Sequence, residues 1–135
     1  MSFTSATKDF NLQFIDGAED TMRGTTIKLW TAVIKESPVK DGRFRANWFA
    51  TGARPSSRVT PKKKVEDSED KTLANATNKV LKQKDASTFT LTNNLPYAQR
   101  LEYGYSDQAR AGVVRVNVKK FNRLLEAEAK KKLPK

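Results

Sequence analysis

The sequence contains no cysteine and no histidine among its 135 residues. The absence of cysteine excludes a disulfide framework. Without either residue type, the chain lacks the commonest general base and the commonest zinc ligands. It also lacks a glycine-rich phosphate loop. We therefore expect no cofactor, no metal site and no enzymatic activity, and we expect the paired carboxylates to be solvated helix faces: Glu19-Asp20, Glu66-Asp67 and Glu69-Asp70.

Long apolar runs are missing as well. No segment approaches the length of a membrane span, and no apolar stretch follows a basic N-terminus, so neither a membrane segment nor a signal peptide is expected. A chain of 135 residues can form one domain with a modest core, and we predict a single domain over residues 1–135. Residues 1–7 and 53–65 are predicted to be mobile, and residues 130–135 form a basic tail.

Positive charge is abundant but unevenly distributed. The net charge is +11. Residues 37–65 carry eight basic and one acidic side chain, and residues 111–135 carry eight basic and two acidic ones. The rest of the chain is close to neutral. This bias indicates an anionic partner, either nucleic acid or an acidic protein face.

The spacing of apolar residues predicts three helices and three strands. A long helix is expected over residues 8–36, with a bend or break near Gly24. A second helix is expected over residues 66–82 with Ser68 as N-cap, and a third from Asn117, as N-cap, to about residue 132. Alternation predicts strands at residues 43–51, 88–92 and 113–118. Pro96 begins a short helical turn that Gly104 ends. Strands separated by helices could form a parallel α/β sheet.

Three blocks of sequence carry a resemblance to a known family. They read SPVKDGRFRANW at residues 37–48, TNNLPYAQRLEYGYSDQARAG at 92–112 and VVRVNVKKF at 113–121. Together they resemble phage neck and tail-completion proteins, the head-to-tail joining proteins of long-tailed DNA phages, including the minor tail protein Z type. The chain departs from many relatives at Arg110, where they have proline, and at Val113, where they have methionine. The resemblance implies an α+β fold: a long N-terminal helix packed on a small, mostly antiparallel sheet, with a middle helix and a C-terminal helix.

The resemblance also implies a structural role in the virion. The protein would be made in the host cytoplasm, assemble at the head–tail junction and help to join tail to head around the DNA channel. Its implied partners are copies of itself in a ring, expected to be a hexamer, a head connector or head-closure protein, and a tail terminator or tail-tube protein, with DNA possible in the lumen. Two alternatives stay open: a tail terminator or head-closure ring protein, and a free basic nucleic-acid-binding protein.

Candidate contact residues fall in two segments. A basic loop over residues 52–64 offers cations to phosphates or to an acidic neighbour. The turn after the second strand offers tyrosine and arginine, which are common interface anchors. The alternatives are a solvated loop, and a turn whose Tyr97 and Leu101 pack on the core. The candidates for partner or DNA contact are Arg54, Arg58, Lys62, Lys63, Lys64, Tyr97, Arg100, Tyr103 and Tyr105.

Two further side chains have an expected structural role. Trp48 shares a predicted strand face with Phe44, so we expect it in the core, packed against Trp30, and not as a stacking platform for a base. Glu102 is expected to form an exposed ion pair with Arg43 or Arg45, worth about 0–1 kcal/mol.

Overall fold

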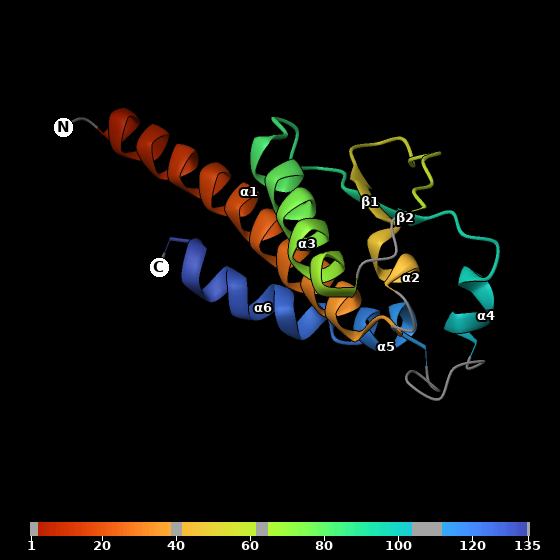
Figure 1. Ribbon diagram of the computed structural model, residues 1–135. Coiled ribbons are helices and arrows are strands. Elements are labelled where there is room, and N and C mark those ends of the chain that lie inside the picture. The colour runs from red at the N-terminus through yellow and green to blue at the C-terminus, as the bar shows by residue number, and fades with distance from the viewer. Residues whose placement is uncertain (1–2, 39–41, 62–64, 104–111, 135) are drawn as a thin grey trace.

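The computed structural model describes residues 3–38, 42–61, 65–103 and 112–134 (Figure 1). The predicted α+β class is confirmed, with a long N-terminal helix, a small antiparallel sheet, and middle and C-terminal helices. In chain order the elements are α1 (Phe3–Glu36), α2 (Arg43–Ala46), β1 (Trp48–Thr51), α3 (Val65–Lys82), β2 (Thr90–Asn93), α4 (Ala98–Glu102), α5 (Val114–Val118) and α6 (Phe121–Lys132).

Helix α1 is the axis on which the other elements assemble. Helices α3 and α6 both lie along it, on different sides (Figure 1). Strands β1 and β2 pair antiparallel, with Trp48 opposite Asn93 and Thr51 opposite Thr90. The sheet packs chiefly on α3, and its packing on α1 is loose.

The core lies between the C-terminal half of α1, α3 and the sheet. Its buried members are Trp30, Ile34, Ala76 and Val80. The Trp30 ring meets Phe89 edge to face, with ring centres 6.4 Å apart, a favourable aromatic geometry. The residues packed around this cluster are Ile27, Leu29, Trp48, Ala50, Leu73, Phe89 and Leu91.

Trp48 occupies the core position expected of it, although its ring is only half-buried. The ring packs edge to face on Phe44 at 5.6 Å between centres. Its indole Nε1 donates to the Ser37 hydroxyl at 2.8 Å, and that hydroxyl donates to the Val33 carbonyl at 2.7 Å. The polar tip of the side chain is therefore satisfied at the end of α1.

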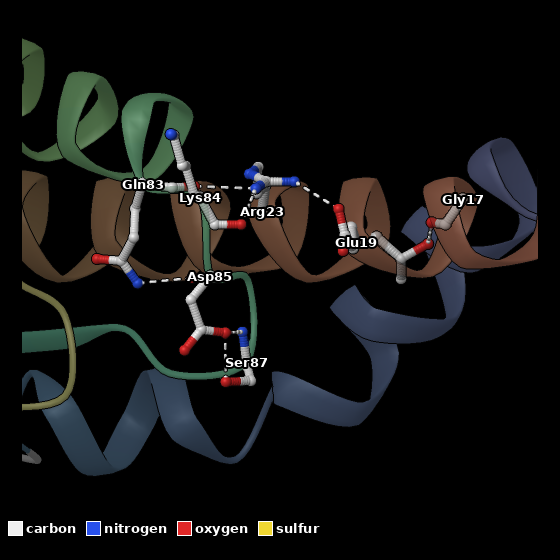
Figure 2. A network of polar contacts seen from close by, with 8 residues as sticks. Gly17, Glu19, Arg23, Gln83, Lys84, Asp85 and Ser87 are labelled. Atoms are coloured by element: carbon white, nitrogen blue, oxygen red, sulfur yellow. Dashed lines mark hydrogen bonds and ion pairs between the residues drawn. The ribbon is translucent and has the colours of Figure 1, made fainter. Parts of the chain in front are cut away.

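Polar contacts attach α3 to α1 at the C-terminal end of α3 (Figure 2). The guanidinium of Arg23 donates to the carbonyls of Gln83 at 2.9 Å and Lys84 at 3.3 Å. Gln83 and Lys84 directly follow the last residue of α3, so Arg23 holds the exit of this helix against α1. Just beyond, the backbone N–H of Ser87 donates to Asp85 at 2.9 Å, and the Ser87 hydroxyl also donates to this carboxylate. These bonds, led by the hydroxyl, hold the pKa of Asp85 below its usual value.

Small residues on α1 let α6 approach closely. Gly17, Thr21 and Thr25 are buried, and both threonine hydroxyls donate to the carbonyl four residues earlier at 2.7 Å. A Cβ added at Gly17 would collide with the backbone carbonyl of Lys132. The expected break at Gly24 does not occur: helix α1 continues through it, and the missing side chain makes room for the Glu128 carboxylate.

Glu128 is a buried acid on the α6 side of this interface, with 4% of its surface exposed. Its carboxylate pairs with the ammonium of Lys28 and lies 3.9 Å from that of Lys131. The hydrogen bond from Lys28 is the main reason that the pKa of Glu128 lies below its usual value. The same bond raises the pKa of Lys28.

The strand predicted at residues 43–51 is wrong in its first half, and the strand predicted at residues 113–118 is wrong entirely. Residues 43–46 form α2, which follows Gly42 in the left-handed region at φ 82°, and only residues 48–51 form a strand. Residues 114–118 form a helix, although the alternate valines favour a strand. The reason is tertiary: a remote carboxylate satisfies the first N–H groups of α5. The second strand is shifted, to Thr90–Asn93.

Several predicted boundaries also move. Helix α1 begins at Phe3 and α3 at Val65, within segments predicted to be mobile, so Ser68 lies inside α3 and does not cap it. Helix α6 begins at Phe121, and Asn117 is buried instead of capping it. The Asn117 carboxamide donates to Glu36 at 2.7 Å and to the Val113 carbonyl at 2.8 Å. Gly104 and Tyr105 lie outside the described residues.

Among the described helices, none combines the length and the apolar character needed to cross a lipid bilayer.

Candidate interaction surface

The chain that leaves β2 is fixed by asparagine side chains. The Asn93 carboxamide donates to the Phe44 carbonyl at 2.9 Å and accepts the N–H of Leu95 at 3.2 Å. Leu95 is buried, with 3% of its surface exposed. The next side chain, Asn94, donates to the carbonyls of Ser56 at 2.7 Å and Arg58 at 3.2 Å. The segment before α4 is thus tied both to α2 and to the basic loop.

Tyr97 had two alternative roles, packing on the core or contact with a partner, and the structure shows that it packs in part. It is half-buried, and its ring centre lies 6.3 Å from that of Phe44. Leu101 is also half-buried and lines a hollow of about 160 Å³ together with Phe44, Trp48 and Val113. Arg100, in contrast, is exposed on α4.

Glu102 caps α5 from eleven residues upstream. One carboxylate oxygen accepts the backbone N–H groups of Val113 at 2.8 Å and Val114 at 2.7 Å. The other accepts the backbone N–H of Arg115 at 2.9 Å and its side-chain Nε at 3.0 Å. The first N–H groups of a helix have no partner within it, so this carboxylate supplies what α5 lacks.

The predicted ion pair of Glu102 with Arg43 or Arg45 is therefore wrong. Glu102 pairs with Arg115, whose guanidinium also donates to the Glu102 carbonyl at 2.6 Å, and Arg45 pairs with Glu69 at 3.3 Å. Burial raises the pKa of the Glu102 carboxyl, but the three backbone donors and Arg115 outweigh it and leave the pKa below its usual value.

Gly112 is required by this arrangement. Its φ of 86° lies in the left-handed region, which side chains other than glycine rarely adopt. A Cβ at this position would also collide with the carbonyl and the carboxylate of Glu102. Glu102 and Gly112 thus lie directly against each other.

An exposed apolar surface surrounds this cap. Tyr103 is 65% exposed, and the Arg115 guanidinium lies 4.6 Å from the centre of its ring. On α5, Val114 and Val118 are 37% and 51% exposed, one helical turn apart. An open hollow of about 360 Å³ lies here, lined by Val114, Arg115, Val116, Val118 and Lys119. We call the surface formed by Tyr103, Val114, Arg115, Val118 and Lys119 the α4–α5 face.

The basic loop is anchored at several points. Asn47 is fully buried, and its carboxamide accepts the Thr60 N–H at 2.8 Å and donates to the Thr60 carbonyl at 2.9 Å. Arg54 and Arg58 are exposed, and the Arg58 guanidinium lies 4.8 Å from the centre of the Phe49 ring. Lys62, Lys63 and Lys64 fall outside the described residues. Mobility of this loop stays a prediction.

Sequence reasoning did not find the cap formed by Glu102, Gly112 and Arg115, or the buried Asn47. The only available signal was their position inside the resemblance blocks at residues 37–48, 92–112 and 113–121. The periodicity of apolar residues does not reveal them, because a side chain that bonds a backbone group far along the chain can stand at any distance from it in the sequence.

Comparison of the chain with protein-family models, with curated proteins and with solved structures gave no match. Within the part of the chain that the structure describes, no three acidic side chains gather as a candidate metal site.

Proposed function

We propose that this protein is a structural component of the neck of a long-tailed DNA phage, which assembles at the head–tail junction and joins the tail to the head. One observation carries the proposal: the three resemblance blocks contact one another and form one structural unit. Ser37 and Trp48 bond within the first block, and Asn93 joins the second block to Phe44 of the first. The Glu102 carboxylate then joins the second block to the start of the third.

The proposed role depends on contact surfaces, and two are present among the described residues. The α4–α5 face combines exposed apolar and basic side chains, which suits a protein neighbour. The basic loop exposes Arg54 and Arg58 and suits DNA in the channel or an acidic neighbouring ring. The proposed partners are copies of the chain in a ring, expected to be a hexamer, a head connector or head-closure protein, a tail terminator or tail-tube protein, and DNA.

A free nucleic-acid-binding protein is the second candidate. The exposed Arg54 and Arg58, in a segment of +7 net charge over residues 37–65, favour it. Salt separates the two roles: binding to phosphates weakens steeply as salt rises, whereas assembly through apolar and hydrogen-bonded contacts weakens much less.

Deletion of the gene from the phage tests the proposed role. We expect a lysate with DNA-filled heads and separate tails, both of normal form in electron micrographs. Purified protein added to these parts should restore joined, infectious particles without nucleotide or metal. Intact joined particles in the deletion lysate would refute the joining role, and tails of abnormal length would favour a tail terminator.

A further inference from the structure

The N-terminal part of α1 extends beyond the helices that cover the rest of it (Figure 1). The end of α6 reaches α1 at Gly17, which faces Lys132. We call residues 3–16 the N-terminal arm. At a rise of 1.5 Å per residue, the arm is roughly 20 Å long.

One face of the arm and the next turn carries exposed apolar and acidic residues. Leu12 and Ile15 are 54% and 53% exposed, and Asp16 and Glu19 are exposed as well. These four positions follow the spacing i, i+3, i+4 and i+7, so they share one side of the helix. At about 3.6 residues per turn, Gly17, Thr21 and Thr25 fall on the opposite side of the helix, against α6.

The arm and the α4–α5 face differ in charge and lie at opposite ends of the molecule. Asp16 on the arm and Glu19 one turn further are exposed acids, and Arg115 and Lys119 on the α4–α5 face are exposed cations. In Figure 1 the N-terminus is at one extreme, and α4 and α5 are toward the other. Each surface also presents exposed apolar side chains, so the two surfaces are complementary in both respects.

We infer that the N-terminal arm of one copy docks on the α4–α5 face of the next copy. Leu12 and Ile15 would cover Val114, Val118 and Tyr103, and the acidic residues of the arm would meet Lys119 and Arg115. Such a head-to-tail contact uses two different surfaces, so it repeats from copy to copy and gives a ring when the rotation closes. The inference names the self-contact of the proposed neck ring and rests on that function for its setting.

Disulfide trapping tests this contact directly, because the chain has no native cysteine. Tagged Ile15→Cys protein is mixed with untagged Val118→Cys protein at high concentration and oxidised, and the mixed dimer is quantified by mass. We expect a mixed disulfide, because sulfurs bridge only when the two backbones come within about 7 Å. The double variant Ile15→Cys/Val118→Cys should give a ladder of covalent oligomers.

Leu81→Cys is the matched control. Leu81 is 59% exposed on α3 and belongs to neither surface. Its pairing with Ile15→Cys should give several-fold less mixed dimer than the pairing with Val118→Cys. Leu12→Cys with Tyr103→Cys is a second pair, used if either first variant fails to fold. If the variants of a pair are folded and still give no more mixed dimer than the Leu81→Cys control, the inference is overturned.

Charge reversal gives an independent readout. Asp16→Lys in the arm should reduce the cross-link with Val118→Cys, and Lys119→Glu on the partner should restore it. A cross-link that neither change affects would show that the surfaces do not dock as inferred.

The contact and the proposed function can fail separately. No trapped dimer, together with separate heads and tails after deletion, would refute the contact and leave the joining role in place. A trapped dimer together with normal particles after deletion would refute the role and leave the self-contact in place.

Discussion

The carboxylate of Glu102 lies 2.8 Å from the backbone nitrogen of Val113, and this bond starts a helix in a segment whose sequence favours a strand. The same carboxylate also accepts from Val114 and Arg115. The position of the α4–α5 face therefore depends on one side chain of α4 and not on the local sequence of α5.

Glu102→Ala should destabilise the protein by about 0.5–2 kcal/mol, because the N–H groups at the start of α5 lose the carboxylate that accepts from them. Urea unfolding would measure the change. Glu126→Ala, at an exposed position of α6, is the control and should stay within about 0.5 kcal/mol of the native protein. An equally small loss for Glu102→Ala would mean that water replaces the carboxylate at no cost.

Substitutions at Gly112 separate its two constraints. Gly112→Ala meets both a φ of 86° and the collision with Glu102, so we expect a loss of more than about 1 kcal/mol. Asparagine tolerates the left-handed region but brings the same Cβ. If the collision dominates, Gly112→Asn should unfold as easily as Gly112→Ala. Recovery of most of the stability in the asparagine variant would show that backbone strain is the larger cost.

Stability should fall at acidic pH through two glutamates. Glu102 and Glu128 both have a pKa below the ordinary glutamate value of 4.5 in the folded protein. Their contribution is therefore complete above that value and is lost as the pH falls through the lower, folded-state pKa. Melting temperatures of Glu128→Gln should vary less with acidic pH than those of the native protein. If the melting temperature of Glu128→Gln depended on acidic pH as strongly as that of the native protein, Glu128 would not contribute to the loss of stability. Glu126→Gln serves as the control.

The pair of Glu128 with Lys28 acts at the other end of the pH scale. The pKa of Lys28 is raised above 10.5, so its contribution is complete below that value and is lost as the pH rises through the higher folded-state pKa. Lys28→Met should therefore show less loss of melting temperature at alkaline pH than the native protein. A parallel alkaline profile for the two proteins would show that the pair does not stabilise the fold.

Replacement of the basic loop side chains tests contact with DNA. Alanine at Arg58, Lys62, Lys63 and Lys64 together should leave stability nearly unchanged, since surface substitutions usually act within about 0.5 kcal/mol each. If the loop meets phosphates, the dependence of DNA binding on salt should decrease in step with the charges removed. An unchanged salt slope would assign the loop to a protein partner or to solvent.

The sequence alone predicts elements whose structure depends on residues close to one another along the chain. Helices α1 and α3 follow from their apolar spacing. Trp30 and Trp48 were both expected in the core; Trp30 is buried there, and Trp48 packs against that core while half-buried. The sequence was insufficient where a distant group decides the local structure. The alternate valines of α5 resemble a strand until the Glu102 carboxylate is in place, and Gly24 resembles a helix breaker until Glu128 fills the space beside it.

The candidate surface was predictable only in part. Tyr103 was a candidate for partner contact, and it is exposed. The apolar side chains that accompany it, Val114 and Val118, were assigned to a strand, so their joint exposure on one helical face could not be foreseen.

The packing of α6 against α1 has a consequence for the order of folding. Helix α1 precedes α6 by most of the chain, so the side of α1 that carries Gly17, Thr21 and Gly24 stays uncovered during synthesis until α6 has emerged. Contacts between such distant segments require a large loop to close before they stabilise anything, which slows folding. The nascent chain therefore leaves the ribosome with its longest helix uncovered on one side, and removal of α6 would leave that side uncovered in the finished protein.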